Sequence, residues 1–197
     1  FFFKQKTAYE IKECDWSSDV CSSDLVYSTS TGDATNPLTL ATSTTLYAHQ
    51  SFQADAQLKA DGTKDARYLL KFKEGLPSRS GPLTADGPTS GTSTLGPNLY
   101  LTASTSQGVI RNEELILLRA EARLATGDKA GAIADLNQVR VNSGGLPAST
   151  LTAASPDADV LTGILYEKRF SLYLEGMRWV DARRYNRLSS LPLDIAS

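Results

Sequence analysis

The sequence has almost none of the residues that usually bind transition metals or carry redox chemistry. Its 197 residues include two cysteines, one histidine and one methionine. Cys14 and Cys21 both lie within the first 25 residues, and no histidine or further cysteine stands nearby to complete a zinc-binding set. We therefore expect no metal site and no cofactor.

A disulfide and a lipidated cysteine are the other roles that Cys14 and Cys21 suggest. A lipobox places small and aliphatic residues directly before its cysteine, whereas Lys12-Glu13 and Asp19-Val20 precede these two. We interpret both cysteines as residues without function. The rest of the chain has no cysteine, so it gives no evidence of a redox compartment.

Long apolar runs and an excess of positive charge are also missing. No stretch of about 18 apolar residues occurs, so the sequence predicts no membrane-spanning helix, and any membrane association would need a lipid anchor or a partner. The net charge is −2, without the basic excess of a nucleic-acid-binding protein. With 41% hydrophobic and 21% charged residues, the composition is that of an ordinary globular protein.

The first 25 residues, FFFKQKTAYEIKECDWSSDVCSSDL, form a segment unlike the rest of the chain. They contain no initiating methionine and neither the basic n-region nor the apolar h-region of a secretion signal. The segment resembles translated sequencing-adapter DNA. We interpret residues 1–25 as a non-native segment without function.

Residues 26–108 are predicted to be a loop-rich region with one short helix and one short strand. Apolar spacing favours a helix over Thr45–Leu58, and alternation favours a strand over Tyr68–Phe72. Prolines and glycines between residues 75 and 108 predict a loop. The single histidine, His49, has no partner nearby in the sequence for a catalytic dyad, so we favour a structural role.

Residues 109–197 are predicted to be helical. Over Asn112–Thr126 a helical stripe is formed by Leu115, Leu118, Ala122 and Ala125. Gly127-Asp128 then supplies a residue that tolerates positive φ followed by a good N-cap, which predicts a tight turn between two helices.

The second helix is expected over Lys129–Val141. Ile133, Leu136 and Arg140 recur at helical spacing, with Ala132 and Val139 beside them on the inward side. Small residues at Ala120, Ala122 and Ala132 would let two antiparallel helices approach closely. The pattern predicts a helical hairpin.

The chain after the hairpin is expected to contain a long loop and two more helices. The loop spans residues 142–159, and Ser155 or Asp157 is the expected N-cap of a helix that runs to about Glu175. Gly176 then breaks the helix, and a short one carries Trp179 to Tyr185. The predicted fold class is mainly α, with tetratricopeptide-like hairpins and long irregular loops.

A series of landmarks gives this region a family resemblance. Ala120, Gly127-Asp128, Ala132 and Leu136 resemble one tetratricopeptide unit. The series that follows resembles the C-terminal part of the SusD/RagB family over residues 65–193, most specifically in the run Glu-Gly-x-Arg-Trp-x-Asp-x-x-Arg. The matching residues are Asp65, Arg67, Glu121, Gly127, Asp128, Asn137, Arg140, Glu167, Arg169, Glu175, Gly176, Arg178, Trp179, Asp181 and Arg184.

The chain departs from the family pattern at three places. Asn142-Ser143-Gly144 stands where relatives usually carry Arg-Ala-Gly, Ser171 replaces a second Glu, and Ala182 replaces a commoner Leu. These changes concern packing and one salt bridge, and they leave the glycine, tryptophan and arginine landmarks in place. Members of the family are far longer, so we expect this chain to be a fragment.

The resemblance implies a non-catalytic surface lipoprotein of the outer membrane. Such a protein captures an oligosaccharide or another nutrient and acts as the lid of a SusC-like TonB-dependent transporter, with its helical repeats facing that partner. We expect the lipidated N-terminus of the family to lie outside this fragment. The alternative from another class is a generic helical-repeat scaffold for protein binding, which would require further repeats at a period of about 34 residues.

The carboxylates among the landmarks also raise the possibility of a glycosidase. Glu167 and Glu175 are eight residues apart, which places them about 12 Å apart along a helix, farther than either glycosidase mechanism uses. Nearby arginines at positions 169, 178, 183 and 184 favour ion pairs that pin the last helices onto the hairpin. A hydrolase that uses Glu167 or Asp181 is the enzymatic alternative.

Glycan-contacting residues are not identified by the resemblance. Trp179 is predicted to be a buried anchor, and replacement of Arg178 or Trp179 by Ala is expected to destabilise the domain. Loop position alone makes Tyr47 and Tyr100 the candidates for stacking on a sugar ring.

Overall fold

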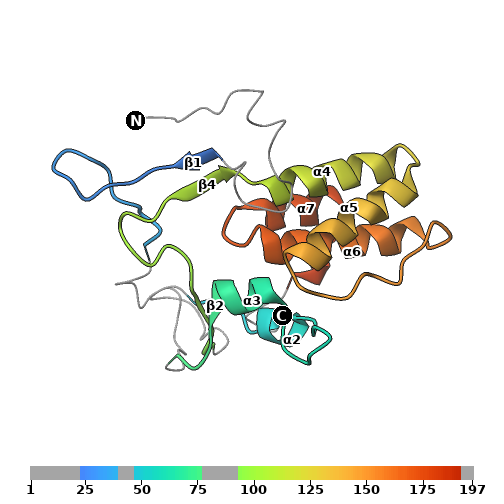
Figure 1. The fold of residues 1–197 in the computed structure, drawn as a ribbon, viewed down its shortest axis with the longest axis horizontal. Coiled ribbons are helices and arrows are strands. Elements are labelled where there is room, and N and C mark those ends of the chain that lie inside the picture. Colours follow the sequence, from blue (N-terminus) through green and yellow to red (C-terminus); the bar gives the residue numbers. More distant parts are fainter. Residues whose placement is uncertain (1–22, 40–46, 77–92, 192–197) are drawn as a thin grey trace.

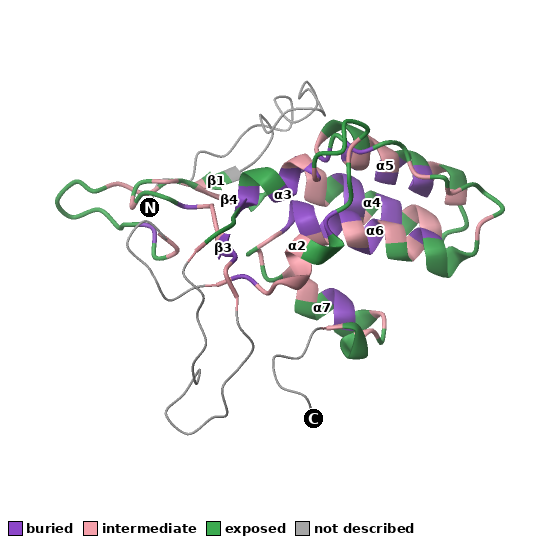
Figure 2. Ribbon diagram, turned by 90° about the horizontal axis from the view of Figure 1, so that it is seen from below, coloured by how far each residue is buried: buried purple, intermediate pink, exposed green. Residues whose placement is uncertain are grey.

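The computed structural model describes residues 23–39, 47–76 and 93–191, and its largest part is a layer of three helices. These are α4 (Asn112–Ala125), α5 (Lys129–Asn142) and α6 (Asp157–Ser171), which lie side by side in Figure 1. Their facing sides carry the buried residues, as Figure 2 shows. The mainly helical fold class predicted above is confirmed. No helix of the described ranges has both the length and the apolar character needed to cross a bilayer.

The core of this layer is aliphatic and tightly packed. Nine buried residues make up the cluster, and Leu124 and Leu151 pack at its edge. Its members are Ile116, Leu117, Ala120, Ala132, Ile133, Leu136, Val139, Val160 and Ile164. Fully buried alanines at positions 120 and 132 allow the close approach of α4 and α5 that the sequence predicts.

The turn between α4 and α5 has the predicted chemistry. Gly127 adopts a φ of +87°, a conformation that glycine reaches without steric cost. Asp128 caps α5, since its carboxylate oxygen Oδ1 accepts a hydrogen bond of 2.9 Å from the Gly131 N–H. The predicted inward residues Ile133, Leu136 and Val139 are buried.

The predicted inward face of α4 is wrong. Leu115 is 42% exposed and Ala122 is exposed, whereas Ile116 and Leu117 are buried. Four consecutive apolar residues at positions 115–118 satisfy helical spacing in more than one frame. The packing of α5 and α6 selects the frame, and the sequence of α4 alone does not contain that information.

A second, aromatic core lies where the early part of the chain meets the end of α6. Phe52 of α2 (Ser51–Asp55) packs edge-to-face on Phe170 and Tyr173, with ring centroids 5.8 and 5.1 Å away. Tyr68 and Phe72 stack at 5.2 Å. The helix predicted over Thr45–Leu58 contains, in the described part, only the five residues of α2. Residues 45 and 46 lie outside the described part.

The strand predicted over Tyr68–Phe72 is also wrong. Residues Ala66–Lys71 form helix α3, which Asp65 caps by accepting a hydrogen bond from the Arg67 N–H. Only Phe72–Lys73 is extended, as β2, which pairs antiparallel with β3 (Gly96–Pro97). Capping by Asp65 and burial of Tyr68 favour the helix more than the alternation of apolar and polar residues favours a strand.

A second two-stranded ribbon projects from the helical layer (Figure 1). It pairs β1 (Ser23–Leu25) with β4 (Gln107–Ile110) in antiparallel register. The loop predicted over residues 75–108 thus missed β3 and the start of β4; residues 77–92 lie outside the described part. Strand pairing uses main-chain groups and demands little of particular side chains.

The interpretation of residues 1–25 as a non-native segment stays a prediction. Cys14 and Cys21 lie outside the described residues.

The end of α6 comes earlier than predicted. The helix stops at Ser171, and Leu174 and Gly176 take positive φ values of +67° and +76° before α7 (Met177–Arg184) begins. A short 3₁₀ helix, Leu188–Ser190, follows. The sharp turn between α6 and α7 folds α7 back beside α6.

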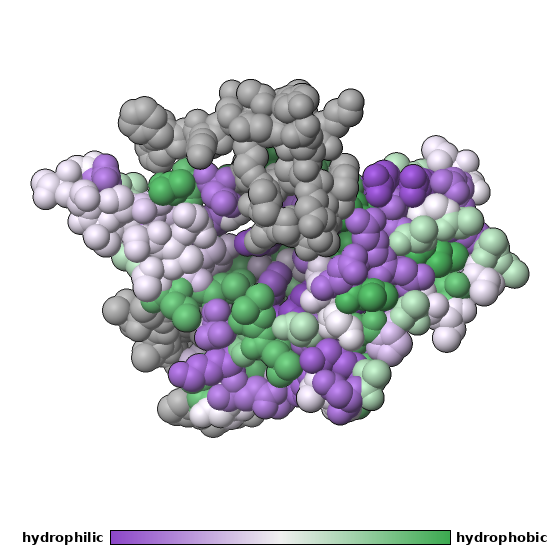
Figure 3. Space-filling model, in the orientation of Figure 1, coloured by the Kyte–Doolittle hydropathy of each residue, from purple (hydrophilic) through white to green (hydrophobic). Residues whose placement is uncertain are grey.

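Apolar surface remains exposed beside the second core. Leu69 and Leu70 of α3 and Val109 and Ile110 of β4 are 45–64% exposed. Figure 3 shows hydrophobic atoms gathered across the middle of one face of the molecule.

Candidate functional site

The most buried landmarks meet around the Arg67 guanidinium. Its Nη2 lies 2.6 Å from Asp65 Oδ2 and 2.6 Å from Glu167 Oε2, and its Nη1 donates to Ser171 Oγ at 3.1 Å. Arg140 of α5 reaches the other oxygen of Glu167, with 3.0 Å between Nη1 and Oε1. The group thus joins the cap of α3, the end of α5 and the middle of α6.

This first network is almost dry. The side chains that form its ion pairs have almost no solvent exposure: 3% for Arg67, 0% for Asp65 and 1% for Glu167. Burial by itself lowers the pKa of Arg67, but the hydrogen bonds and charges of Asp65 and Glu167 raise that pKa above its ordinary value. Burial raises the pKa of Glu167, and the two guanidiniums oppose that rise.

A second network is centred on Lys168. Its ammonium lies 2.7 Å from Glu121 Oε1 and 2.7 Å from Asp181 Oδ2, and all three side chains are buried. Tyr185 donates a 2.8 Å hydrogen bond to the other oxygen of Glu121, which also pairs with Arg184. This network ties α4, α6 and α7 together.

The remaining landmarks are held separately. Glu175 Oε1 lies 2.6 Å from Arg111 Nε, and Arg169 pairs with Asp55 at 2.6 Å and donates to Ser51 Oγ at 2.8 Å. Asn137 Oδ1 accepts a 2.8 Å hydrogen bond from the Ser149 N–H. Gly127 and Asp128 form the α4–α5 turn, and Gly176 precedes α7.

The landmark acids therefore pair with cations, but their partners differ from those expected. Glu167 binds Arg67 and Arg140, and Asp181 binds Lys168; arginines near them in sequence were expected instead. Glu167 and Arg169 are two residues apart on α6 and so do not face each other. Asp181 is three residues from both Arg178 and Arg184 on α7, but it pairs with Lys168 because α7 packs on α6. Partners on other elements, such as Arg67 and Arg111, become visible only in the folded chain.

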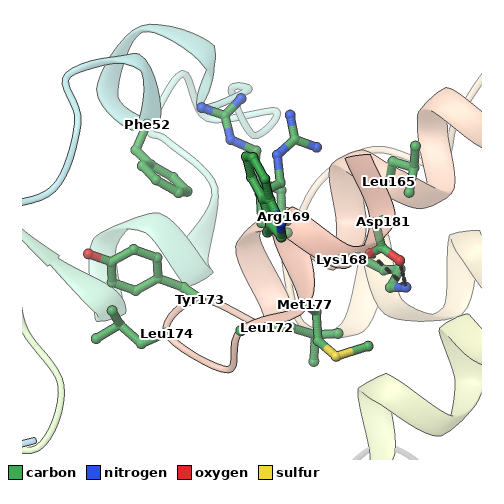
Figure 4. A pocket seen from close by; sticks show the side chains of 12 residues that line it. Phe52, Leu165, Lys168, Arg169, Leu172, Tyr173, Leu174, Met177 and Asp181 are labelled. Carbon is green, nitrogen blue, oxygen red and sulfur yellow. Dashed lines mark hydrogen bonds and ion pairs between the residues drawn. The ribbon is translucent and has the colours of Figure 1, made fainter. Parts of the chain in front are cut away.

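A pocket of about 340 Å³ lies beside the second network, between α2, the end of α6 and the start of α7. Figure 4 shows Phe52 and Tyr173 on one side and Lys168 and Asp181 on the other. Twelve residues line it: Phe52, Leu165, Lys168, Arg169, Leu172, Tyr173, Leu174, Gly176, Met177, Arg178, Trp179 and Asp181. Its size is at the lower end of the range for small-molecule sites, roughly 300–1,000 Å³.

The exposure of Trp179 and Tyr100 corrects the roles predicted for them from the sequence. Trp179 is 57% exposed, so the prediction that it is a buried anchor is wrong. Its position in the first turn of α7 faces the pocket and solvent instead of a helix. Tyr100, a candidate for stacking on a sugar, is only 4% exposed and unavailable for that role, whereas Tyr47 is partly buried.

Phe52, Tyr173 and Met177 are pocket residues that the sequence did not single out. Phe52 lies more than 100 residues from the other two. Tyr173 lies just before the Glu-Gly-x-Arg-Trp run, and Met177 occupies the unspecified position of that run. Their only signal is aromatic or apolar character next to a predicted helix end, which many core residues share. The turn after α6 brings them together.

Metal binding and histidine chemistry have no support in the described ranges. No group of three or more His, Asp, Glu or Cys side chains there is placed to hold a metal ion. The ring nitrogen Nδ1 of His49 accepts a 3.0 Å hydrogen bond from the Ser51 N–H at the start of α2, as a structural histidine does.

Comparison with known proteins supports the family resemblance. Residues 98–191 match the model of the SusD family. This part of the chain is similar to the SusD family. The matched SusD segment contains every landmark from Glu121 to Arg184, whereas Asp65 and Arg67 lie outside it and join it through Glu167.

A solved structure with a TM-score above 0.5 shows the SusD-like fold as well. A SusD superfamily protein from Bacteroides vulgatus ATCC 8482 aligns with a TM-score of 0.57 and 17% identity, over 73% of this chain and 34% of its own. Another, from Bacteroides fragilis NCTC 9343, aligns with a TM-score of 0.49 and 20% identity, over 70% of this chain and 29% of its own. The chain thus spans about a third of the length of these relatives. None of the curated proteins matches it.

Proposed function

We propose that this chain is part of a nutrient-binding protein that captures an oligosaccharide, or another nutrient, at the cell surface without cleaving it. The SusD-family match over residues 98–191 is the observation that carries the proposal. Binding of glycans or other nutrients during uptake is what membership of this family implies.

The charge networks support binding over catalysis. A general acid or nucleophile must be free to exchange a proton or attack the substrate. Glu167 is engaged by two guanidiniums, and Asp181 by the Lys168 ammonium that also binds Glu121. These acids act as fixed partners in the fold, so the hydrolase alternative has no free carboxylate among them.

The proposal extends to a partner and a place. The complete protein would sit on the outer face of the outer membrane through an N-terminal lipid anchor, as a lid on a SusC-like TonB-dependent transporter. The helical layer of α4, α5 and α6 would face that transporter. Pull-down of the transporter encoded beside the gene tests this part, and a failure to co-purify under conditions that keep both proteins folded contradicts it.

Ligand binding is tested by calorimetry on the full 197-residue chain. A panel of neutral and acidic oligosaccharides is titrated, with a mixture of unrelated peptides as the comparison. We expect saturable binding of at least one oligosaccharide class and none of the peptides. Peptide binding without any saccharide binding would contradict the proposal and favour the helical-repeat scaffold.

A further inference from the structure

The pocket between α2, α6 and α7 has walls suited to a flat, partly apolar ring. Phe52 and Tyr173 stand on one side, and the half-exposed indole of Trp179 lies in the lining. Aromatic faces pack well against the C–H faces of sugar rings as well as against other apolar surfaces. This lining favours a ring-shaped ligand over an extended aliphatic chain.

The charged groups of the pocket differ sharply in how they are paired. Lys168 contacts both Glu121 and Asp181, so its charge is already compensated. Arg169 binds Asp55 and lies over the Phe52 ring, 4.6 Å from its centroid. The one carboxylate in the lining, Asp181, is thereby committed to Lys168.

Arg178 is the exception. Within the described ranges no hydrogen bond or ion pair of its guanidinium is found, although it is half-buried in the pocket wall. Burial lowers the pKa of Arg178 and the neighbouring Arg169 lowers it further, whereas the charges of Asp181 and Asp55 partly oppose that shift. A partly desolvated guanidinium without a directly bonded acid is costly, and an anion from outside the chain would relieve that cost.

We propose that this pocket binds the carboxylate of an acidic sugar residue within an oligosaccharide, with Arg178 as the partner of the carboxylate and Trp179 packing on the ring. This inference rests on the proposed function, because it names the substrate class of the same nutrient-binding protein. A guanidinium suits a carboxylate because its N–H groups form two parallel hydrogen bonds. A neutral sugar offers no such partner.

Calorimetry with trigalacturonate and its fully methyl-esterified counterpart tests the proposal on the full chain. The two ligands share their rings and differ in charge. We expect trigalacturonate to bind about 10- to 100-fold more tightly than the ester, since a hydrogen bond to a charged group contributes that much. Arg178→Gln should remove this preference and leave the weaker binding of the ester unchanged.

Arg183→Gln is the matched control. Arg183 lies on the same helix, is exposed, and does not line the pocket. Its replacement should preserve the preference for the acid. Circular dichroism of both variants verifies that they fold. If the indole packs on the sugar ring, Trp179→Ala should lower the affinity for trigalacturonate and for its ester by the same factor.

Three outcomes overturn the inference. Equal affinity for trigalacturonate and its ester removes the acidic-sugar assignment, and retention of the preference in Arg178→Gln removes the role of Arg178. In both cases saccharide binding persists, so the proposed function stands. Absence of binding by every acidic and neutral oligosaccharide overturns the inference and the proposed function together.

Discussion

The Arg67 guanidinium serves as the shared partner of two buried carboxylates, Asp65 and Glu167. A buried carboxylate is tolerated only when cations and hydrogen bonds replace the water it loses. Glu167 meets this condition through Arg67 and Arg140, which come from two other elements. At the scale of the residue, the landmark acids therefore stabilise the fold by holding elements together.

Glu167→Gln is expected to lower the free energy of unfolding by about 3 kcal/mol, because the two guanidiniums lose the carboxylate charge that compensates them in a buried site. Urea unfolding followed by circular dichroism measures the change. Asp157→Asn is the control, since its pair with Lys129 is 2.7 Å long but Asp157 is 69% exposed. That change should cost less than about 1 kcal/mol. Equal losses for the two variants would contradict the role given to Glu167.

Lys71 predicts a dependence of stability on pH. Burial lowers the pKa of its ammonium to about 8 from 10.5, and the charges that face it are those of Glu113, Arg111, Glu175 and Arg67. Between these two pKa values the unfolded chain binds more protons than the folded chain, so stability should rise with pH from about 8 to about 10.

Above pH 10 the trend should reverse. Burial raises the pKa of Tyr173 to about 12, so the folded chain keeps a proton that the unfolded chain loses. Urea midpoints measured from pH 7 to 11 should therefore pass through a maximum near pH 10. In Lys71→Met the rise from pH 8 should vanish; a rise of the same size in that variant would show that another group causes it.

At the scale of the element, the end of α5 depends on a glycine. A Cβ at Gly144 would lie 2.7 Å from the Arg140 carbonyl oxygen and 2.9 Å from Arg67 Nη2. The Gly144 carbonyl accepts a 2.9 Å hydrogen bond from the Ala66 N–H at the start of α3. The connection after α5 thus holds α3 and its buried arginine in place.

Gly144→Ala is expected to destabilise the chain by about 1–3 kcal/mol, because backbone atoms must shift to admit the methyl group. Thermal unfolding by circular dichroism measures the effect. Thr150→Ala, in the exposed part of the same connection, should change stability by no more than about 0.5 kcal/mol. A melting curve of Gly144→Ala that overlies the parent curve would contradict the close packing.

Elements specified by local chemistry could be predicted from the sequence, and elements chosen by packing could not. Gly127-Asp128 contains its own turn and cap, so the hairpin follows from those residues alone. The inward face of α4 depends on α5 and α6, and the helix at Ala66–Lys71 depends on the cap by Asp65 and the burial of Tyr68. Alternation over so few residues does not decide between helix and strand.

The candidate site was the least predictable part. The motif that contains Arg178 and Trp179 could be found in the sequence, but its local context suggested a buried anchor instead of a pocket wall. The walls formed by Phe52 and Tyr173 come from elements more than 100 residues apart in the sequence. No local pattern links such residues, so only the fold reveals that they share a site.

At the scale of the whole molecule, two cores are joined by charge networks. The aliphatic core of α4, α5 and α6 and the aromatic core around Phe52 and Phe170 meet along α6. Arg67 and Lys168 link α6 to the elements on either side of it. The pocket lies where α6 turns into α7, next to these fixed charges, which hold its walls in place as the proposed binding site requires.

The chain is proposed to bind a saccharide and to release it intact. Ultrafiltration of the full chain with an oligosaccharide panel, followed by mass spectrometry of the retained and released sugars, measures binding and cleavage in the same sample. We predict that at least one oligosaccharide is retained by the protein and released at its original mass. Release of shorter products, or retention of none of the panel, would contradict the account.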